Sequence, residues 1–126
     1  MQLKVNGDIL VVPVEINGAM TLDFMIDSGA SDVSIPADAF STLSRTGTIK
    51  ESDLVGQRTY VLADGSKAES AFFTIKSLRL QNIILNDVTG SVGPSQGPLL
   101  LGQSFLQRFK SWSIDNTKRE LVLESK

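Results

Sequence analysis

The sequence predicts an all-β protein in which a closed or sandwiched sheet is accompanied by one or two short helices. Its apolar segments are short, and turn-forming residues separate them at close spacing. Only two segments carry a helical spacing of apolar residues, and both are brief. This pattern is typical of barrels and sandwiches. The 126 residues suit one compact domain over residues 1–126, large enough to bury a core of its own.

The first hairpin is predicted by two apolar segments on either side of Asn17-Gly18. Residues 9–16 form its first strand, which Pro13 interrupts, so a kinked or edge strand is expected. Asn and Gly both accept positive φ and therefore favour a type I′ turn. Residues 20–26 form the second strand, and Asp27 stands where this strand ends in a turn.

The next stretch is predicted to pass from a short strand through a helix into a polar loop. Residues 33–35 are the strand, and residues 36–43 are the helix, with Pro36 suited to its first position. Residues 44–56 are polar and are expected to be loop, with a helical turn near residues 52–54. The pattern determines this loop least of all parts of the chain.

A second hairpin is predicted around Asp64-Gly65. Residues 58–62 and 68–75 flank this pair, which is a common hairpin turn. Residues 83–92 then read as another strand, which ends at the Gly- and Pro-rich loop 93–98. The turn at Asp64-Gly65, like the one at Asn17-Gly18, is predicted to join two strands that are consecutive in the sequence.

The C-terminal quarter is predicted to be strand, helix and a last pair of strands. Residues 99–101 form an apolar strand that closes on Gly102 and leads into a short helix over residues 104–109. Residues 112–115 and 121–123 are strands joined by the turn at 116–119.

The composition excludes several chemistries. The chain has no cysteine and no histidine, which removes thiol nucleophiles, Cys/His metal sites and serine–histidine mechanisms. Its net charge of −2 and its lack of a basic block give no electrostatic reason to expect nucleic acid, so a peptide or protein partner is favoured. No run reaches the ~20 apolar residues of a membrane helix, and the first residues are too polar for a signal peptide. The chain is expected to be soluble as given, in the cytoplasm or as the soluble part of an anchored or periplasmic precursor.

Asp27-Ser28-Gly29 is the candidate site. The Asp27 carboxylate follows the apolar alternation of residues 20–26 and precedes a glycine turn, so it is set against partly desolvated surroundings. An Asp-Ser-Gly triplet by itself is more often a plain turn or a helix cap. Context therefore decides between a turn and a catalytic carboxylate.

Three separated segments give that context. Residues 24–31 resemble the active-site signature of aspartic proteases, in the one-copy form of retroviral proteases and their bacterial relatives. Residues 60–66 are similar to the flap hairpin of that family, and residues 99–106 to its apolar-apolar-Gly segment with the following helix. The resemblance runs from about residue 14 to residue 123 and implies the closed, barrel-like acid-protease fold, with one lobe per chain.

The resemblance implies peptide-bond hydrolysis by a water molecule held between two carboxylates that share one proton, a dyad for which aspartic proteases are the standard example. Each chain has a single such triplet, so a homodimer would supply Asp27 twice, with Ser28 and Gly29 completing the catalytic loop. No cofactor and no metal is implied. The expected contacts with a peptide substrate come from the catalytic loop and the flap, namely Ala30, Ser31, Asp32, Leu62, Ala63, Asp64 and Gly65.

Two departures from the retroviral pattern stand in the sequence: Gln103 follows Gly102 where those enzymes often carry Arg, and the flap tip has Ala63 where theirs is richer in Gly. Bacterial members are the closer match. One alternative is a catalytically silent member of the fold that binds an extended peptide or serves as a dimerisation module. Another is a carboxylate metal site, which the lack of clustered Asp and Glu around Asp27 disfavours.

Overall fold

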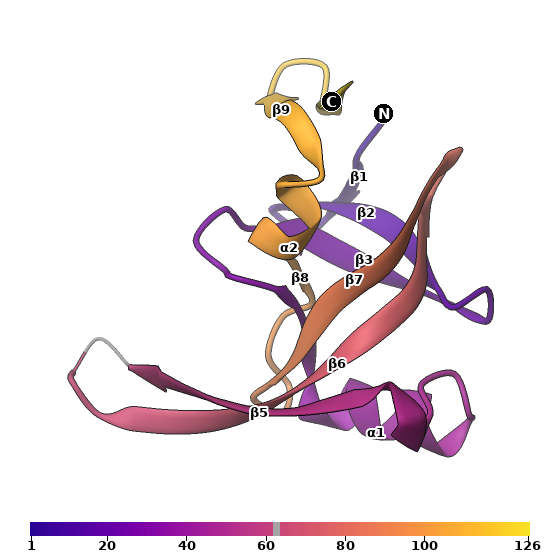
Figure 1. The fold of residues 1–126 in the computed structure, drawn as a ribbon. Helices are drawn as coiled ribbons and strands as arrows, with labels where there is room; N and C mark the ends of the chain where they lie inside the picture. Colours follow the sequence, from indigo (N-terminus) through magenta and orange to yellow (C-terminus); the bar gives the residue numbers. More distant parts are fainter. Residues whose placement is uncertain (62–63) are drawn as a thin grey trace.

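The computed structural model describes residues 1–61 and 64–126, and it consists mainly of strands with few short helices (Figure 1). Leu62 and Ala63, two of the expected flap contacts, lie outside the described residues. The elements in chain order are β1 (Lys4–Asn6), β2 (Ile9–Ile16), β3 (Met20–Ile26), β4 (Val33–Pro36), α1 (Ala37–Arg45), the 3₁₀ turn η1 (Glu51–Asp53), β5 (Leu54–Val61), β6 (Lys67–Leu80), β7 (Ile83–Gly93), β8 (Leu100–Leu101), α2 (Gln103–Leu106), β9 (Phe109–Asp115) and β10 (Glu120–Ser125).

Eight of these strands form one sheet that closes on itself. Their order is β1-β2-β3-β8-β4-β7-β6-β5, and β2 also pairs with β6 through Glu15↔Arg79 and Ile16↔Leu78. This additional pairing joins two parts of the sheet that are distant in the strand order, so the sheet curls into a barrel around one apolar core. The predicted all-β, barrel-like fold is confirmed.

The first hairpin forms as predicted. Asn17 and Gly18 have φ of 52° and 67°, and the Ala19 N–H closes the turn on the Ile16 carbonyl at 3.0 Å. β2 lies between β1 and β3 in the sheet order, but its pairing with β1 ends at Val11 and its pairing with β6 begins at Glu15, so Pro13 stands at a local edge. Pro13 falls between the stretch of β2 that pairs with β1 and the stretch that pairs with β6, so its missing N–H interrupts neither ladder.

Both predicted helices have different ends in the structure. Pro36 is the N-cap of α1, with ψ of 152°, and the helix runs on to Arg45. α2 stops at Leu106, and Phe109 begins β9 rather than ending the helix. The cause at Phe109 is tertiary, since this residue pairs with Ser125 of β10. The helical turn expected near residues 52–54 is present as η1. The strand predicted to begin at residue 58 is β5, which already begins at Leu54.

The short strand β8 is the element that positions the site. It lies between β3, with which it runs parallel, and β4, with which it pairs antiparallel. The segment between β3 and β4 therefore has to loop out around the end of β8, and this segment carries Asp27-Ser28-Gly29. We refer to residues 27–32 as the catalytic loop, after the role that the resemblance implies for Asp27.

The two chain ends meet at a small second sheet formed by β9 and β10. Gln2 forms a bridge with Glu120, the Leu3 N–H donates to Arg119, and the Leu121 N–H donates to Met1. The N-terminal residues thus extend one edge of the C-terminal hairpin (Figure 1). No helix among residues 1–61 and 64–126 is long and apolar enough to cross a membrane.

Candidate active site

Asp27 is held at the end of β3 by its own backbone and by β8. Its N–H donates to the Leu101 carbonyl at 3.0 Å, and its carbonyl accepts from the Ala30 N–H at 3.2 Å. One carboxylate oxygen, Oδ1, accepts the Gly29 N–H at 2.9 Å. The half-buried carboxylate is therefore oriented by a short turn whose backbone is fastened to the barrel. This turn geometry alone is common to many Asp-Ser-Gly turns, whereas the link to β8 is specific to this topology.

Gly102, at the end of β8, lets the catalytic loop fold close to the barrel. A Cβ atom at this position would stand 2.5 Å from the Ala30 carbonyl oxygen and 2.3 Å from that of Asp32. Such contacts are far inside van der Waals distance, and both atoms belong to backbone that has no rotamer to change. The two backbones therefore approach closely at this position, and only glycine fits here.

The first residues of α2 bind the catalytic loop directly. The Gln103 N–H donates to the Ala30 carbonyl at 2.8 Å, and the Ser104 N–H donates to the Ser31 carbonyl at 2.9 Å. The Gln103 side chain reaches further back and donates through Nε2 to the Ser28 carbonyl at 2.8 Å. Gln103, the departure from the retroviral pattern, thus fastens the loop beside the catalytic triplet.

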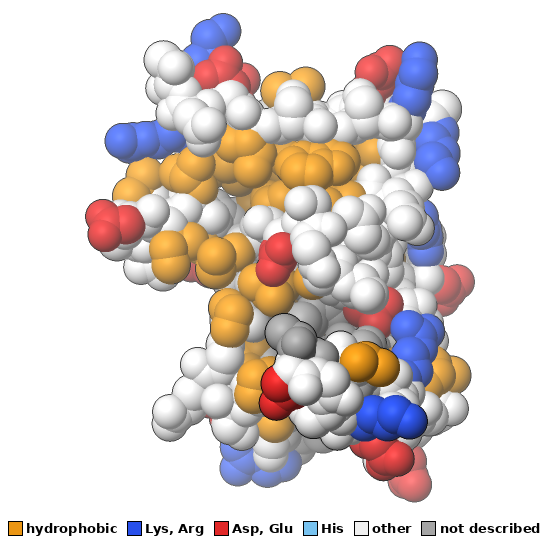
Figure 2. All heavy atoms as spheres, turned by 90° about the vertical axis from the view of Figure 1, so that its left-hand side faces the viewer, with side chains coloured by type: hydrophobic (Ala, Val, Ile, Leu, Met, Phe, Trp, Pro, Cys, Tyr) orange, Lys and Arg blue, Asp and Glu red, His pale blue; other side chains and the backbone are white. Residues whose placement is uncertain are grey.

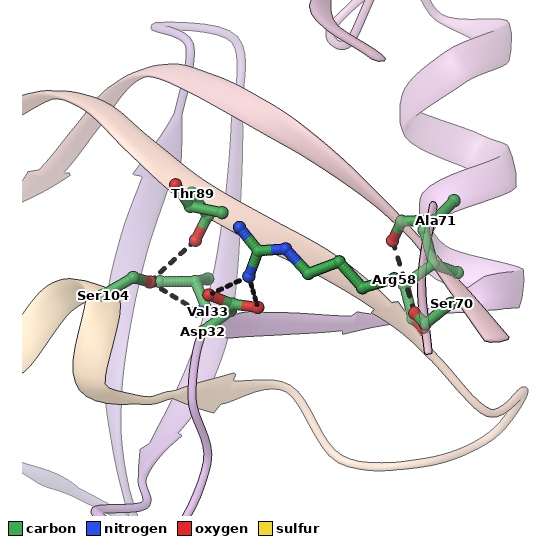
Figure 3. A network of polar contacts seen from close by, with 8 residues as sticks. Asp32, Val33, Arg58, Ser70, Ala71, Thr89 and Ser104 are labelled. Carbon is green, nitrogen blue, oxygen red and sulfur yellow. Dashed lines mark hydrogen bonds and ion pairs between the residues drawn. The ribbon is translucent and has the colours of Figure 1, made fainter. Parts of the chain in front are cut away.

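Ser104 links the loop to the barrel as well. Its hydroxyl donates to the Thr89 carbonyl at 2.7 Å and accepts the Val33 N–H at 2.9 Å (Figure 3). The contact spans α2, β7 and the start of β4. A serine after a Gln in a short helix gives no sequence signal of this role, because its partners lie 15 and 71 residues away.

Asp32, where the catalytic loop joins β4, is buried and ion-paired. Its carboxylate is 6% exposed and lies 3.2 Å from Nη1 of Arg58 on β5 (Figure 3). The Arg58 guanidinium also stacks over the Phe72 ring of β6, 4.2 Å from the ring centroid. Ser31, by contrast, is exposed. Sequence reasoning missed Arg58, since a lone Arg in a strand forms no motif.

The hairpin expected to be the flap is formed by β5 and β6, which pair out to Val61↔Lys67. Near its tip Gly65 has a φ of 85°, and the Asp64 Oδ1 atom accepts hydrogen bonds from the N–H and the hydroxyl of Ser66. The two bonds hold the pKa of Asp64 below the ordinary value of 3.8. The predicted turn at Asp64-Gly65 is present.

The catalytic loop and the flap project to the same side of the molecule, the left in Figure 1. Figure 2 looks onto this side, where the surface is notched between its upper and lower parts. A band of hydrophobic side chains crosses the upper part, at the height of α2 and β9 in Figure 1. Among the described residues, no three or more Asp or Glu side chains are grouped so as to hold a metal ion.

Comparison with solved structures places the fold in a known class. The structure of a retropepsin-like aspartic protease from Rickettsia conorii superposes with a TM-score of 0.68 and 26% sequence identity, over 96% of this chain and 86% of that one. The retroviral protease-like domain of Ddi1 from Leishmania major superposes with a TM-score of 0.62 over 98% of this chain and 92% of that one. The latter pair is 18% identical, so it bears on the fold alone. The fold is that of retropepsin-like proteins.

The sequence itself identifies the family. Residues 12–108 match the family described as gag-polyprotein putative aspartyl protease, and this chain belongs to that family. No curated protein matches the sequence. The matched segment contains the catalytic loop, the flap and β8 with Gly102, so the resemblance drawn from the three segments is confirmed.

Proposed function

We propose that this protein is an aspartic endopeptidase whose active site is formed by two copies of Asp27 in a homodimer. The observation that carries the proposal is the geometry of Asp27, whose carboxylate is oriented by the Gly29 N–H while its backbone is anchored to Leu101 of β8. A carboxylate fixed in this way at the end of β3 can meet a symmetry-related copy in a defined orientation. The family to which the chain belongs supports the same chemistry.

In the proposed reaction the two Asp27 carboxylates share one proton, because two negative charges at about 3 Å cannot both be maintained. The ionised carboxylate takes a proton from the bound water as its oxygen attacks the peptide carbonyl carbon. The neutral one protonates the departing amine nitrogen as the C–N bond breaks. Water is thereby divided between the new carboxyl group and the new amino group, and the shared proton is restored.

The peptide is proposed to lie in extended form between the catalytic loop and the flap. Ala30 and Ser31 would contact it from the loop, and Leu62, Ala63, Asp64 and Gly65 from the flap. Asp32 would take part at the edge of the cleft, where its carboxylate is bound to Arg58. Ser28 and Gly29 would complete the base of the site, Ser28 by hydrogen bonding across the dimer axis.

The homodimer is proposed because each chain carries the triplet once, and a two-fold axis is the simplest way to bring two copies together. The hydrophobic band on the face that carries the catalytic loop supports a second copy on that side (Figure 2). The candidate interface strands are residues 2–5 and 121–123. Within one chain Gln2 pairs with Glu120 and the Leu121 N–H donates to the Met1 carbonyl, so the two chain ends would enter the interface as one unit.

The direct test is cleavage of a peptide library at several pH values by the wild type and by Asp27→Asn. This substitution keeps an oxygen acceptor for the Gly29 N–H but cannot carry the dyad's proton or charge. We expect the variant to fold and dimerise yet cleave nothing, and the wild type to show a bell-shaped pH profile centred in mildly acidic conditions. A chelator should leave the rate unchanged. Cleavage by Asp27→Asn would remove this carboxylate from the mechanism.

A second measurement separates the enzyme from the alternative of a silent peptide-binding or dimerisation module. The wild type is titrated with a peptide in which a hydroxyl-bearing tetrahedral carbon replaces the cleaved carbonyl. An enzyme of the proposed kind binds this analogue more tightly than the parent peptide, because its site complements the transition state. Equal binding of both peptides with no cleavage would favour the silent module.

A further inference from the structure

The Arg58 side chain of the flap contacts the buried Asp32 carboxylate. Arg58 lies midway along β5, and its guanidinium contacts both the catalytic loop and the second flap strand: Asp32 at 3.2 Å and the Phe72 ring at 4.2 Å. A planar guanidinium can pair and stack at the same time, which a lysine ammonium cannot do equally well. The orientation of Arg58 is thus fixed from two directions.

Ser70, the cross-strand partner of Arg58, is also bound to the barrel. Arg58 pairs with Ser70 on β6, and the Ser70 hydroxyl donates to the Val92 carbonyl of β7 at 2.5 Å. The two flap strands are therefore attached at the same pair of residues: Arg58 binds the catalytic loop (Figure 3), and Ser70 binds β7. We call this pair of residues the flap rung.

Beyond the flap rung the hairpin extends into solvent. The strands continue through Thr59↔Glu69 to Val61↔Lys67, and the side chains of these four residues are all exposed. A two-stranded ribbon is marginally stable without packing. The position of its outer part is therefore set by the rung at which it is attached.

We propose that Arg58 is a positioning residue that couples the flap to the loop carrying Asp27. It acts through Asp32, which stands five residues after Asp27 in the catalytic loop and whose carbonyl packs on Gly102. Loosening the ion pair would weaken the attachment of β5 to a buried carboxylate and free the flap to move away from the catalytic loop. The proposal rests on the proposed function, because its consequence for rate requires that a peptide is cleaved under this flap.

The test uses Arg58→Met and Arg58→Lys, with Arg79→Met as the matched control. Arg79 lies on β6, the strand that pairs with β5, is exposed, and binds the Gln81 carbonyl far from the flap. The first readout is native-state hydrogen exchange of the backbone N–H groups of residues 59–61 and 67–69. We expect these groups to exchange at least about tenfold faster in Arg58→Met, while the barrel strands change no more than in the control. Arg58→Lys should fall between the two.

The second readout is peptide hydrolysis. Because the flap holds bound peptide, Arg58→Met should raise KM at least about tenfold with a smaller change in kcat. Arg79→Met should alter neither. The effects of Asp32→Asn and Arg58→Met should be less than additive in the double variant, since the two side chains contact each other.

The outcomes distinguish this proposal from the proposed function. Unchanged flap exchange in Arg58→Met overturns the coupling, whether or not the protein cleaves peptides. Faster exchange in the flap and in the barrel strands alike assigns Arg58 a general stabilising role and also overturns it. If flap exchange is faster in Arg58→Met but the wild type cleaves no peptide, the coupling is supported and the proposed endopeptidase function is overturned. An altered preference among peptides with acidic side chains, with unchanged flap exchange, would make Arg58 a subsite instead.

Discussion

Gly102 packs against the backbone of Asp32 so closely that a Cβ atom would stand 2.3 Å from the Asp32 carbonyl oxygen. The end of β8 and the end of the catalytic loop are thus in direct backbone contact. Hydrogen bonds from the Gln103 and Ser104 N–H groups to the Ala30 and Ser31 carbonyls hold the catalytic loop in place immediately beside this contact. The position of Asp27 follows from the packing of a strand more than seventy residues later in the sequence.

The first prediction concerns this glycine. Gly102→Ala forces β8 and the catalytic loop apart, and we expect a loss of about 3 kcal/mol in the free energy of unfolding, or failure to fold. Chemical denaturation measures the change. The control is Gly56→Ala on β5, where a Cβ atom would meet the Phe72 ring at an ordinary 3.5 Å and φ is not positive. Equal stability of the two variants would contradict the close packing described for Gly102.

The second prediction concerns Ser104. Ser104→Ala leaves the Val33 N–H and the Thr89 carbonyl without this partner in a partly buried place, and we expect a loss of about 2 kcal/mol. Thermal or denaturant unfolding measures it. Ser111→Ala is the matched control, because the Ser111 hydroxyl binds Glu124 at the surface and its removal should cost less than about 0.5 kcal/mol. A neutral Ser104→Ala would show that this link between α2, β7 and β4 contributes nothing.

The third prediction concerns acid stability. The Gln96 N–H donates to the Asp38 carboxylate at 3.1 Å and holds the pKa of Asp38 below its ordinary value of 3.8. A carboxyl whose pKa is depressed by folding stabilises the native state above its unfolded pKa, and this contribution is lost as the pH falls through the folded pKa. We therefore expect Asp38→Asn to flatten the fall of melting temperature below about pH 4. Asp8→Asn, at an exposed position, controls for the change in net charge, and an identical acid profile in both variants would refute the role of Gln96.

Local elements of this fold could be predicted from sequence because local chemistry decides them. Asn17-Gly18 and Asp64-Gly65 form turns whatever the strands beside them do, since these residues accept positive φ without strain. The helix assigned to residues 104–109 fails at its end for the opposite reason. Phe105 and Phe109 have helical spacing, and the centroids of their rings lie 5.3 Å apart. Pairing of Phe109 with β10 nevertheless overrides the local helical pattern.

The candidate site divides in the same way. Asp27, Ser28 and Gly29 form a contiguous motif that can be recognised in the sequence. The resemblance to a family then predicts that residues 99–102 belong to the same site. Arg58 and Ser104 have no such signal, because each acts on a partner brought near only by the closed sheet. The roles of Arg58 and Ser104 are visible only in the folded structure, because neither residue belongs to a sequence motif or to a periodic pattern.

The fourth prediction concerns the central claim, which is that one active site takes Asp27 from each of two chains. Its most direct test is to mix a fixed amount of wild type with increasing Asp27→Asn, allow the subunits to exchange, and measure peptide cleavage. Mixed dimers contain one Asp27 and should be inactive. At a ninefold excess of the variant, about one-tenth of the wild-type chains remain paired with each other, so activity should fall to about one-tenth. Activity that stays constant throughout the titration, with subunit exchange verified by mass spectrometry, would contradict the shared site.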